Sequence, residues 1–188
     1  MNHLINEAKT IRDHSLFRTI LMAMSHPGSV YPVPELEDEP DAVTCLLGCM
    51  MDNEVGFAVI DDPDLETRLA KQTCGRPAPV DAADFIIAPK GSTQGAIGRF
   101  KRGTLEYPDK GATVVYLVET LGYGNISFTL SGPGVDGEAD LEISGFGWEE
   151  LRNLRDVNIE FPLGVDALFM DSAGRIAAIP RSSQIGVN

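Results

Sequence analysis

The segment FPLGVDALFMDSAGRIAAIPRS, residues 161–182, is the stretch that best indicates the fold. Residues 165–170 and 176–179 are short apolar runs, and the intervening DSAG, residues 171–174, consists of turn-forming residues. Apolar runs of this length, flanked by Gly, Pro and Asp, are typical of strands rather than helices. Pro162 and Pro180 bracket the two runs, because proline donates no hydrogen bond to a sheet. We therefore expect a β-hairpin here.

Two charged residues flank the expected hairpin. Asp166 follows the turn PLG, residues 162–164, and Arg181 follows Pro180. One interpretation is a pair of solvated strand-end charges or a structural ion pair. The other is that Arg181 faces an anion or a partner subunit, because a guanidinium offers a fixed fork of donors.

Outward from the hairpin, helices alternate with strands in the first half of the chain. Residues 113–119 contain VVYLV and leave no polar face, which predicts a central strand covered on both sides. Asp62-Pro63 predicts a helix start. Strands at residues 55–60, 85–88, 125–130 and 141–143 and a helix at 146–156 complete the pattern. This order predicts an α/β fold with a mixed sheet and helices on both faces, in a single domain over residues 1–188.

The N-terminal region predicts a helix on an apolar face. Residues 1–10 are polar and are expected to form an arm or a frayed helix. A helix is expected from about Asp13 to the break at His26-Pro27. Its apolar residues share helical spacing and form a stripe: Leu16, Phe17, Ile20, Leu21 and Met24. Residues 35–41 read as an acidic loop, and residues 41–51 as a buried helix.

Charge and hydropathy exclude some classes of partner. The net charge of −13 argues against nucleic-acid binding through a broad basic surface. The tight basic cluster, Arg99, Lys101 and Arg102, is expected in a solvated surface loop. No apolar run approaches the ~20 residues of a membrane span, and no secretory signal pattern appears. We therefore expect neither a membrane nor a nucleic-acid partner.

The cysteines indicate a reducing compartment. The chain has an odd number of cysteines, Cys45, Cys49 and Cys74. An odd number does not indicate a disulfide framework, which fits a cytoplasmic protein. Cys45 and Cys49 share one face of the expected helix, and no His or further Cys lies at metal-ligand spacing from them. We expect both to be buried small apolar residues.

The motif search predicts no catalytic residue, no metal site and no cofactor. GPGVDG, residues 132–137, matches G-x-G-x-x-G, but the residues that follow alternate like a strand, which favours a structural turn over a nucleotide site. Lys90 follows a strand, as a pyridoxal-phosphate lysine would, but a solvated loop lysine is favoured. The three histidines lack zinc spacing. His26 is expected to complement the C-terminal end of a helix rather than act as a general base.

Three blocks of the sequence resemble a known family. They are FRTILMAMSHPG at residues 17–28, LSGPG at 130–134, and FPLGVD with IPRSS at 161–166 and 179–183. In this order they resemble the phosphonate metabolism protein H (PhnH) family, the H subunit of the bacterial carbon–phosphorus lyase core complex. The blocks span nearly the whole chain, whereas residues 35–109 align poorly.

The resemblance implies a three-layer α/β/α sandwich with a mixed sheet, similar to a reduced core of pyridoxal-phosphate (PLP)-dependent transferases, and a homodimer. It also implies an accessory subunit that supports phosphonate catabolism with the G, I and J subunits. Their first step forms alkylphosphonate ribose triphosphate from ATP by displacing adenine. Radical cleavage belongs to the J subunit, and this chain lacks the cysteine set of an iron–sulfur cluster. The role of this chain would be assembly, without independent activity.

Two alternatives stay open. The chain is a subunit that binds a phosphorylated nucleotide or a phosphonate, with candidate ligand residues taken from the matching blocks: Arg18, His26, Asp166 and Arg181. Otherwise it is a stand-alone enzyme of the PLP type.

Overall fold

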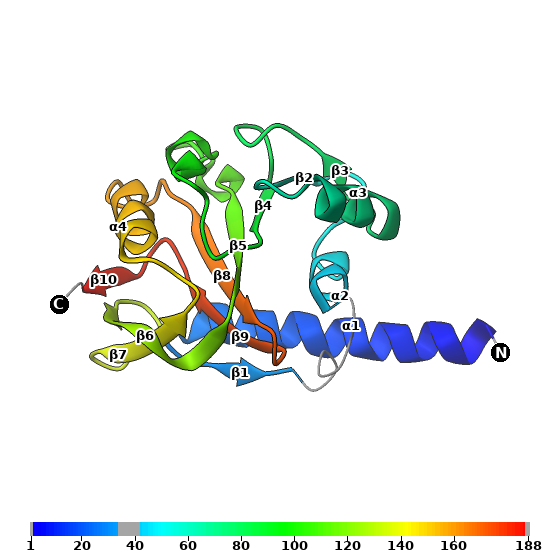
Figure 1. Ribbon diagram of the computed structural model, residues 1–188, viewed down its shortest axis with the longest axis horizontal. Coiled ribbons are helices and arrows are strands. Elements are labelled where there is room, and N and C mark those ends of the chain that lie inside the picture. The colour runs from blue at the N-terminus through cyan, green and yellow to red at the C-terminus, as the bar shows by residue number, and fades with distance from the viewer. Residues whose placement is uncertain (1, 34–41, 187–188) are drawn as a thin grey trace.

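A computed structural model describes residues 2–33 and 42–186, with side chains from residue 10 onward (Figure 1). The expected acidic loop at 35–41 lies outside the described residues. The helices are α1 (Asn2–Ser25), α2 (Ala42–Gly48), α3 (Pro63–Gln72) and α4 (Trp148–Val157), with the short 3-10 helices η2 (Ala96–Arg99) and η3 (Pro108–Lys110). The protein is thus of mixed α/β class.

The main sheet has seven strands in the order β1-β9-β8-β5-β4-β2-β3. Their bounds are β1 (Tyr31–Pro32), β2 (Gly56–Val59), β3 (Arg76–Pro77), β4 (Phe85–Ala88), β5 (Thr113–Val118), β8 (Asp166–Asp171) and β9 (Arg175–Ile179). The strands from β3 to β8 are parallel, whereas β9 runs antiparallel to β8 and β1. The predicted mixed sheet is confirmed. A second sheet, in the order β10-β6-β7, contains β6 (Thr120–Ser131), β7 (Ala139–Ser144) and β10 (Gln184–Gly186).

The predicted central strand is β5, which lies between β4 and β8. Val114 and Tyr116 belong to one core cluster, and Val115, between them, belongs to another. The alternation follows from the two-residue period of a strand. Apolar residues are therefore needed at successive positions of β5.

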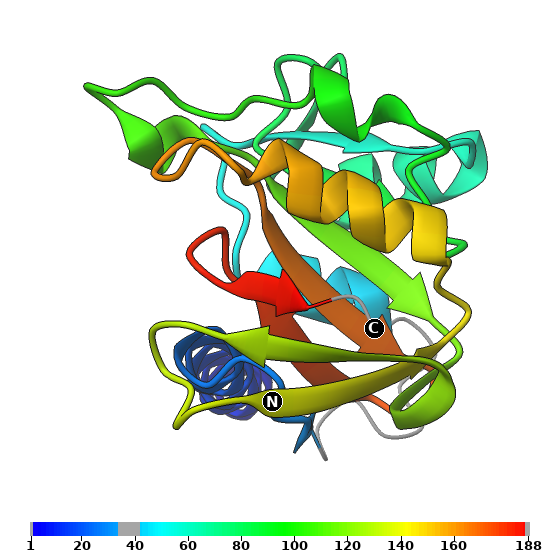
Figure 2. The same ribbon diagram turned by 90° about the vertical axis from the view of Figure 1, so that its left-hand side faces the viewer.

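Different elements cover the two faces of the main sheet. One cluster joins the sheet to α1, α2 and α3, and includes Leu16, Leu46 and Leu69. The other cluster joins the sheet to α4 and to strands β6 and β7, and includes Leu154 and Phe128. Figure 2 shows α4 and the second sheet together on this side of the molecule. The helix predicted at residues 146–156 is α4, and the second sheet covers this face together with it.

The predicted hairpin is confirmed as β8 and β9, paired with Leu168 opposite Ala178. Asp171, expected in the turn, is instead the last residue of β8, and its side chain is buried. Its Oδ1 accepts hydrogen bonds from the N–H groups of Ala173 and Arg175, at 3.0 and 2.9 Å. Its Oδ2 accepts from Leu121 N–H of the second sheet at 3.1 Å. One carboxylate thus closes the hairpin and ties it to β6.

The N-terminal region forms one continuous helix. α1 begins at Asn2, so the helical alternative expected for residues 1–10 is the one present, and it is continuous with the helix expected from about Asp13, because residues 2–12 contain no proline or glycine to interrupt it. The expected apolar stripe also divides between two faces. Leu16 and Ile20 are buried, whereas Phe17 and Leu21 are 45% and 50% exposed. In addition to its core face, α1 therefore presents an apolar face to solvent.

The G-x-G-x-x-G segment is a turn, as predicted. It connects β6 to β7, so a strand follows it where a nucleotide fingerprint needs a helix. None of the described helices is long and apolar enough to cross a membrane.

The cysteine prediction is partly wrong. Cys45 and Cys49 are half-buried rather than buried, and Cys74 is exposed; all three are free thiols. Burial raises the pKa of Cys49 to about 12, with Asp13 adding to the effect. The Cys49 thiol is therefore protonated at neutral pH and is a poor nucleophile.

The basic cluster is not simply a solvated loop. Lys101 forms an ion pair with Asp84, and Arg102 Nη2 lies 2.7 Å from Glu160 Oε2. Asp84, which directly precedes β4, also accepts a hydrogen bond at Oδ2 from Gly56 N–H at 2.8 Å. This carboxylate therefore connects the start of β4 to the start of β2. Two of the three cations therefore connect segments that are distant in the sequence.

Asp84 provides an expected pH dependence. Burial alone raises the pKa of Asp84, but hydrogen bonds from Lys101 and Gly56 and the nearby ammonium charges outweigh it, so the pKa lies below its ordinary value. A depressed folded-state pKa stabilises the protein above the unfolded pKa of about 3.9, and the effect is lost as the pH falls through the folded value. D84N should lower the free energy of unfolding at pH 7 by about 0.5–1 kcal/mol, since the pair is partly exposed.

Urea unfolding between pH 7 and pH 3 measures this effect, with D81N at an exposed position as the matched control. The difference between wild type and D84N should shrink below about pH 4. A constant difference across this range would contradict the assignment.

Candidate functional site

The charged residues of the C-terminal block form a clamp that is largely, but not fully, buried. Asp166 begins β8 and Arg181 follows β9, so the hairpin brings them together. The side chains are 17% and 13% exposed and form an ion pair. Arg181 Nε also lies 3.1 Å from each Asp166 oxygen, and Arg181 N–H donates to Oδ1 at 2.8 Å. The structural ion pair, one of the two interpretations offered by the sequence, is thus present.

The same guanidinium reaches beyond the hairpin. Arg181 Nη1 donates to the carbonyl of Pro108 at 2.7 Å, and Nη2 donates to that of Gly111 at 3.4 Å. Gly111 leaves room for it, because a Cβ there would lie 2.2 Å from Arg181 Nη1. The donors of Arg181 are directed at protein oxygens, which leaves its guanidinium little capacity for an added anion.

The other two candidate residues lie elsewhere, on or beside α1. Arg18 is exposed on the helix. His26 follows the last turn, and its Nδ1 lies 3.1 Å from the carbonyl of Met22. The histidine thus sits at the helix C-terminus, as expected. Eight residues separate Arg18 from His26, which corresponds to roughly 12 Å along a helix. The four candidates therefore form one ion pair and two separate surface positions.

The three sequence blocks meet at a packing junction. A Cβ on Gly134 would lie 2.1 Å from the carbonyl oxygen of Ser25, and one on Gly28 would lie 2.8 Å from the Cβ of Ala139. A Cβ on Gly132 would lie 3.1 Å from the carbonyl oxygen of Ser182. All three glycines have positive φ, which side-chain-bearing residues rarely adopt. These blocks consequently fix the contact between α1, the β6–β7 turn and the segment after β9.

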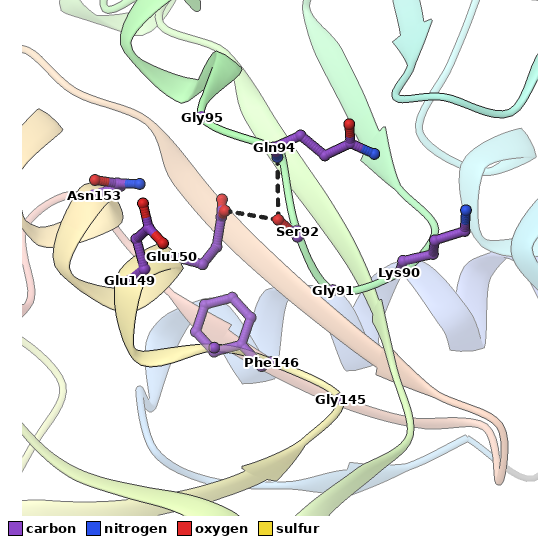
Figure 3. Close-up of a pocket in the computed structure, with 11 residues that line it drawn as sticks. Lys90, Gly91, Ser92, Gln94, Gly95, Gly145, Phe146, Glu149, Glu150 and Asn153 are labelled. Carbon is purple, nitrogen blue, oxygen red and sulfur yellow. Dashed lines mark hydrogen bonds between the residues drawn. The ribbon is translucent and has the colours of Figure 1, made fainter.

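A hollow of about 470 Å³ lies at the opposite edge of the sheet from the clamp. It opens where the loop after β4 meets the N-terminal end of α4 (Figure 3). The carboxyl edge of parallel strands is where ligands bind in open α/β sheets. Its lining includes Lys90, Gly91, Ser92, Gln94, Gly95, Gly145, Phe146, Gly147, Glu149, Glu150 and Asn153.

Glu150 is the buried carboxylate among the residues that line the hollow. Its side chain is 4% exposed, and its carboxylate accepts from three hydroxyl groups. Thr93 and Tyr116 donate to Oε1 at 2.6 and 2.7 Å, and Ser92 donates to Oε2 at 3.2 Å. Burial raises the pKa of Tyr116 well above its ordinary value, and the adjacent carboxylate raises it further. The phenol is therefore a permanent donor that fixes α4 against β5.

The charges around the hollow limit its chemistry. The lining includes two carboxylates, Glu149 and Glu150, and a single ammonium group, that of Lys90. Figure 3 shows Lys90 pointing away from Glu149 and Asn153. A ligand with several negative charges would meet repulsion here, so the hollow is poorly suited to a nucleoside triphosphate. Within residues 10–33 and 42–186, no group of three His, Cys, Asp or Glu residues is placed to hold a metal ion.

The sequence analysis did not find Glu150 or the hollow. A signal existed, because Glu150 shares the buried face of α4 with Leu154 and Val157, at spacings of four and seven. A carboxylate on an apolar stripe must find donors, since an unpaired buried charge is costly. The partners themselves come from β5 and the β4 loop, which no local pattern connects to α4.

These features define a mixed-sheet α/β protein with polar clamps that lock its loops and an exposed apolar face on its longest helix. The family model described as bacterial phosphonate metabolism protein (PhnH) matches residues 7–186. The chain belongs to this family. A protein of Stutzerimonas stutzeri, named putative C-P lyase subunit protein HtxG, is 34% identical over 180 residues, which cover 94% of this chain and 87% of that protein. The predicted family resemblance is confirmed.

Proposed function

We propose that this chain is an accessory subunit of a carbon–phosphorus lyase complex and supports phosphonate catabolism by assembly. The observation that carries the proposal is family membership over residues 7–186. The name of the Stutzerimonas stutzeri relative supports it. The exposed apolar face of α1 suits a subunit whose surface contacts other proteins.

Within the complex, we infer that the partners are the G, I and J subunits and that the reaction supported is formation of alkylphosphonate ribose triphosphate from ATP. We also infer a cytoplasmic protein with a single domain. Its main sheet, with covering layers on both faces, is consistent with a three-layer sandwich similar to a reduced PLP-transferase core.

Growth on an alkylphosphonate as the sole phosphorus source tests the proposal. A strain lacking the gene should fail to grow on the alkylphosphonate, grow normally on phosphate, and recover when the gene is restored. Normal growth of the deletion strain on the alkylphosphonate would contradict the proposal.

The ligand-binding alternative has weaker support. Arg18, His26 and the Asp166–Arg181 pair do not converge on one cavity, and the hollow at the sheet edge is net acidic. Calorimetry with ATP and alkylphosphonates, with and without the partner subunits, tests it directly. An absorbance scan with added pyridoxal phosphate tests the stand-alone enzyme of the PLP type. Such an enzyme should show a Schiff-base band, and the absence of the band would contradict this alternative.

The exposed face of α1 supports the homodimer. At 100° per residue, its exposed apolar residues fall within one arc on the side opposite Leu16. They are Ile11, Phe17, Leu21 and Met22, from 40% to 66% exposed. A contiguous apolar face of this kind marks a protein interface. A two-fold contact of α1 with its copy would place Arg18 inside the interface.

Replacing Phe17 and Leu21 by aspartate should break the homodimer, because four charges would then enter an apolar contact. We expect the dimer dissociation constant to rise at least about 100-fold, measured by analytical ultracentrifugation. L105D changes a residue that is 79% exposed on another surface and is the matched control. A dimer that persists unchanged in F17D/L21D would place the interface elsewhere.

A further inference from the structure

The walls of the hollow beside α4 are fixed by contacts within the protein. Its two loops touch, because a Cβ on Gly91 would collide with the carbonyl oxygen of Gly145, and a Cβ on Gly145 would lie 2.8 Å from the backbone nitrogen of Glu119. Gln94 in the same lining has a φ of 52°, which residues with a side chain rarely adopt. Walls that are in place beforehand reduce the entropy lost when a ligand binds.

Glu150 brings a buried negative charge to the lining of this hollow without a cation to balance it. Its carboxylate accepts from three hydroxyl groups, which are neutral donors. Among the side chains that the structure describes, no lysine, arginine or histidine forms an ion pair with it. Buried charges in proteins are normally paired. A carboxylate has about four acceptor positions, so Glu150 can still accept from a charged donor.

The other side chains of the lining suit a positively charged ligand as well. Glu149 and Asn153 lie four residues apart on α4 and therefore share one face of the helix. Phe146 adds an aromatic wall, and its ring is held by Tyr116 and Phe169 at centroid distances of 5.0 and 5.2 Å. Aromatic rings attract organic ammonium ions through the negative face of the π system. Carboxylates and an aromatic ring thus meet at one hollow.

The full set of nearby charges favours a cation over an anion. Lys90 is the one cationic residue in the lining, against two carboxylates, and Figure 3 shows it directed away from Glu149. The charged residues that adjoin the lining are divided equally between basic and acidic ones: Arg99, Arg152, Asp61 and Glu119. The two carboxylates of the lining therefore decide the sign of the site.

The size of the hollow indicates a small molecule. Its volume of about 470 Å³ lies in the range of small-molecule sites. A metal ion is a poor match, because no group of three His, Cys, Asp or Glu residues in the described part of the chain is placed to hold one.

We propose that this hollow binds a small organic ammonium compound. The ammonium group lies at Glu149 and Glu150, against the ring of Phe146, and Asn153 forms a hydrogen bond with the polar remainder of the ligand. This site goes beyond the proposed function and does not depend on it, because it assigns a ligand to a part of the molecule that assembly through α1 does not use.

Ethanolamine and ethylene glycol are matched probes, because they differ only in an ammonium group that replaces one hydroxyl group. Each is titrated into the isotope-labelled full-length protein, and the amide signals are followed by NMR. Ethanolamine should shift the signals of Gly91, Gly145 and the Asn153 side chain saturably, with a dissociation constant of about 1–10 mM for so small a ligand. Ethylene glycol should cause no saturable shift.

Variants of opposite sign locate the bound cation. E149Q should weaken ethanolamine binding about 3-fold, since Glu149 is exposed. E149Q/E150Q should weaken it at least about 10-fold. K90M should strengthen it about 2-fold, because it removes a competing ammonium group. E138Q is the matched control, because it removes an exposed carboxylate in the β6–β7 turn, outside the lining, and should change nothing.

The absence of a saturable shift with ethanolamine, or equal shifts with ethylene glycol, would overturn this inference. Unchanged affinity in both E149Q and E149Q/E150Q would overturn it as well, and unfolding temperatures establish that these variants are folded. None of these results bears on the accessory-subunit role, which growth on an alkylphosphonate tests separately.

Discussion

Arg181→Ala should lower the free energy of unfolding by about 3 kcal/mol, no more than the lower end of the cost of breaking a buried ion pair, because this pair is partly exposed. The substitution leaves the Asp166 carboxylate, which is 17% exposed, with its hydrogen bond from the backbone of residue 181 but without its cation. It also removes the guanidinium donor from the carbonyl of Pro108, which then accepts only from Gly111 N–H at 3.1 Å. Urea unfolding measures the loss, which corresponds to a fall in unfolding temperature of roughly 6–12 °C.

Arg155→Ala is the matched control. Arg155 Nη2 lies 2.8 Å from Asp156 Oδ1, but this pair is about half exposed and should contribute only ~0–1 kcal/mol. Arg181→Lys should fall between the two, because an ammonium cannot reproduce the forked contact with Asp166 and the two carbonyls. If R181A were no less stable than R155A, the clamp would not stabilise the fold.

Glu150→Leu should have an effect of similar size, for a different reason. Leucine is apolar and suits a buried position, but it leaves the hydroxyl groups of Thr93 and Tyr116 without an acceptor. Both residues are fully buried, and an unpaired buried donor costs about 1–3 kcal/mol. We expect a loss of about 2–5 kcal/mol in the free energy of unfolding.

Trp148, the only tryptophan, lies in α4 and reports unfolding by fluorescence. Glu150→Gln retains an acceptor oxygen and should cost less than E150L. Glu149→Leu, at the adjacent exposed position, is the control and should change stability by no more than about 0.5 kcal/mol. Equal stabilities of E150L and E149L would show that the three hydroxyl contacts contribute nothing.

The strands and turns of the core were predictable because their signals are local. The β8–β9 hairpin, the β5 strand and the α3 start at Asp62-Pro63 follow from short runs and turn residues, and all three are confirmed. Asp62 Oδ1 accepts from Leu65 N–H at 2.9 Å, as an N-cap does. The start of α1 was left open between an arm and a frayed helix, because polar residues without a breaker look alike in both.

The contacts that define the candidate surfaces were not predictable in the same way. The sequence placed Asp166 and Arg181 at the two ends of one hairpin, so their pairing was foreseeable. It gave no sign that Arg181 also reaches Pro108, 73 residues away. Likewise the apolar positions of α1 showed a helix, but which of them face solvent depends on where β9 packs. Tertiary contacts decide both questions.

The central claim is that this chain is a stoichiometric subunit of a carbon–phosphorus lyase complex. A tagged copy, expressed at its native level in cells grown on an alkylphosphonate, should be purified and analysed by quantitative mass spectrometry and native mass spectrometry. The account predicts that the other core subunits co-purify in a fixed ratio to this chain. Recovery of the protein alone as a homodimer, from cells that contain the other subunits, would contradict the claim.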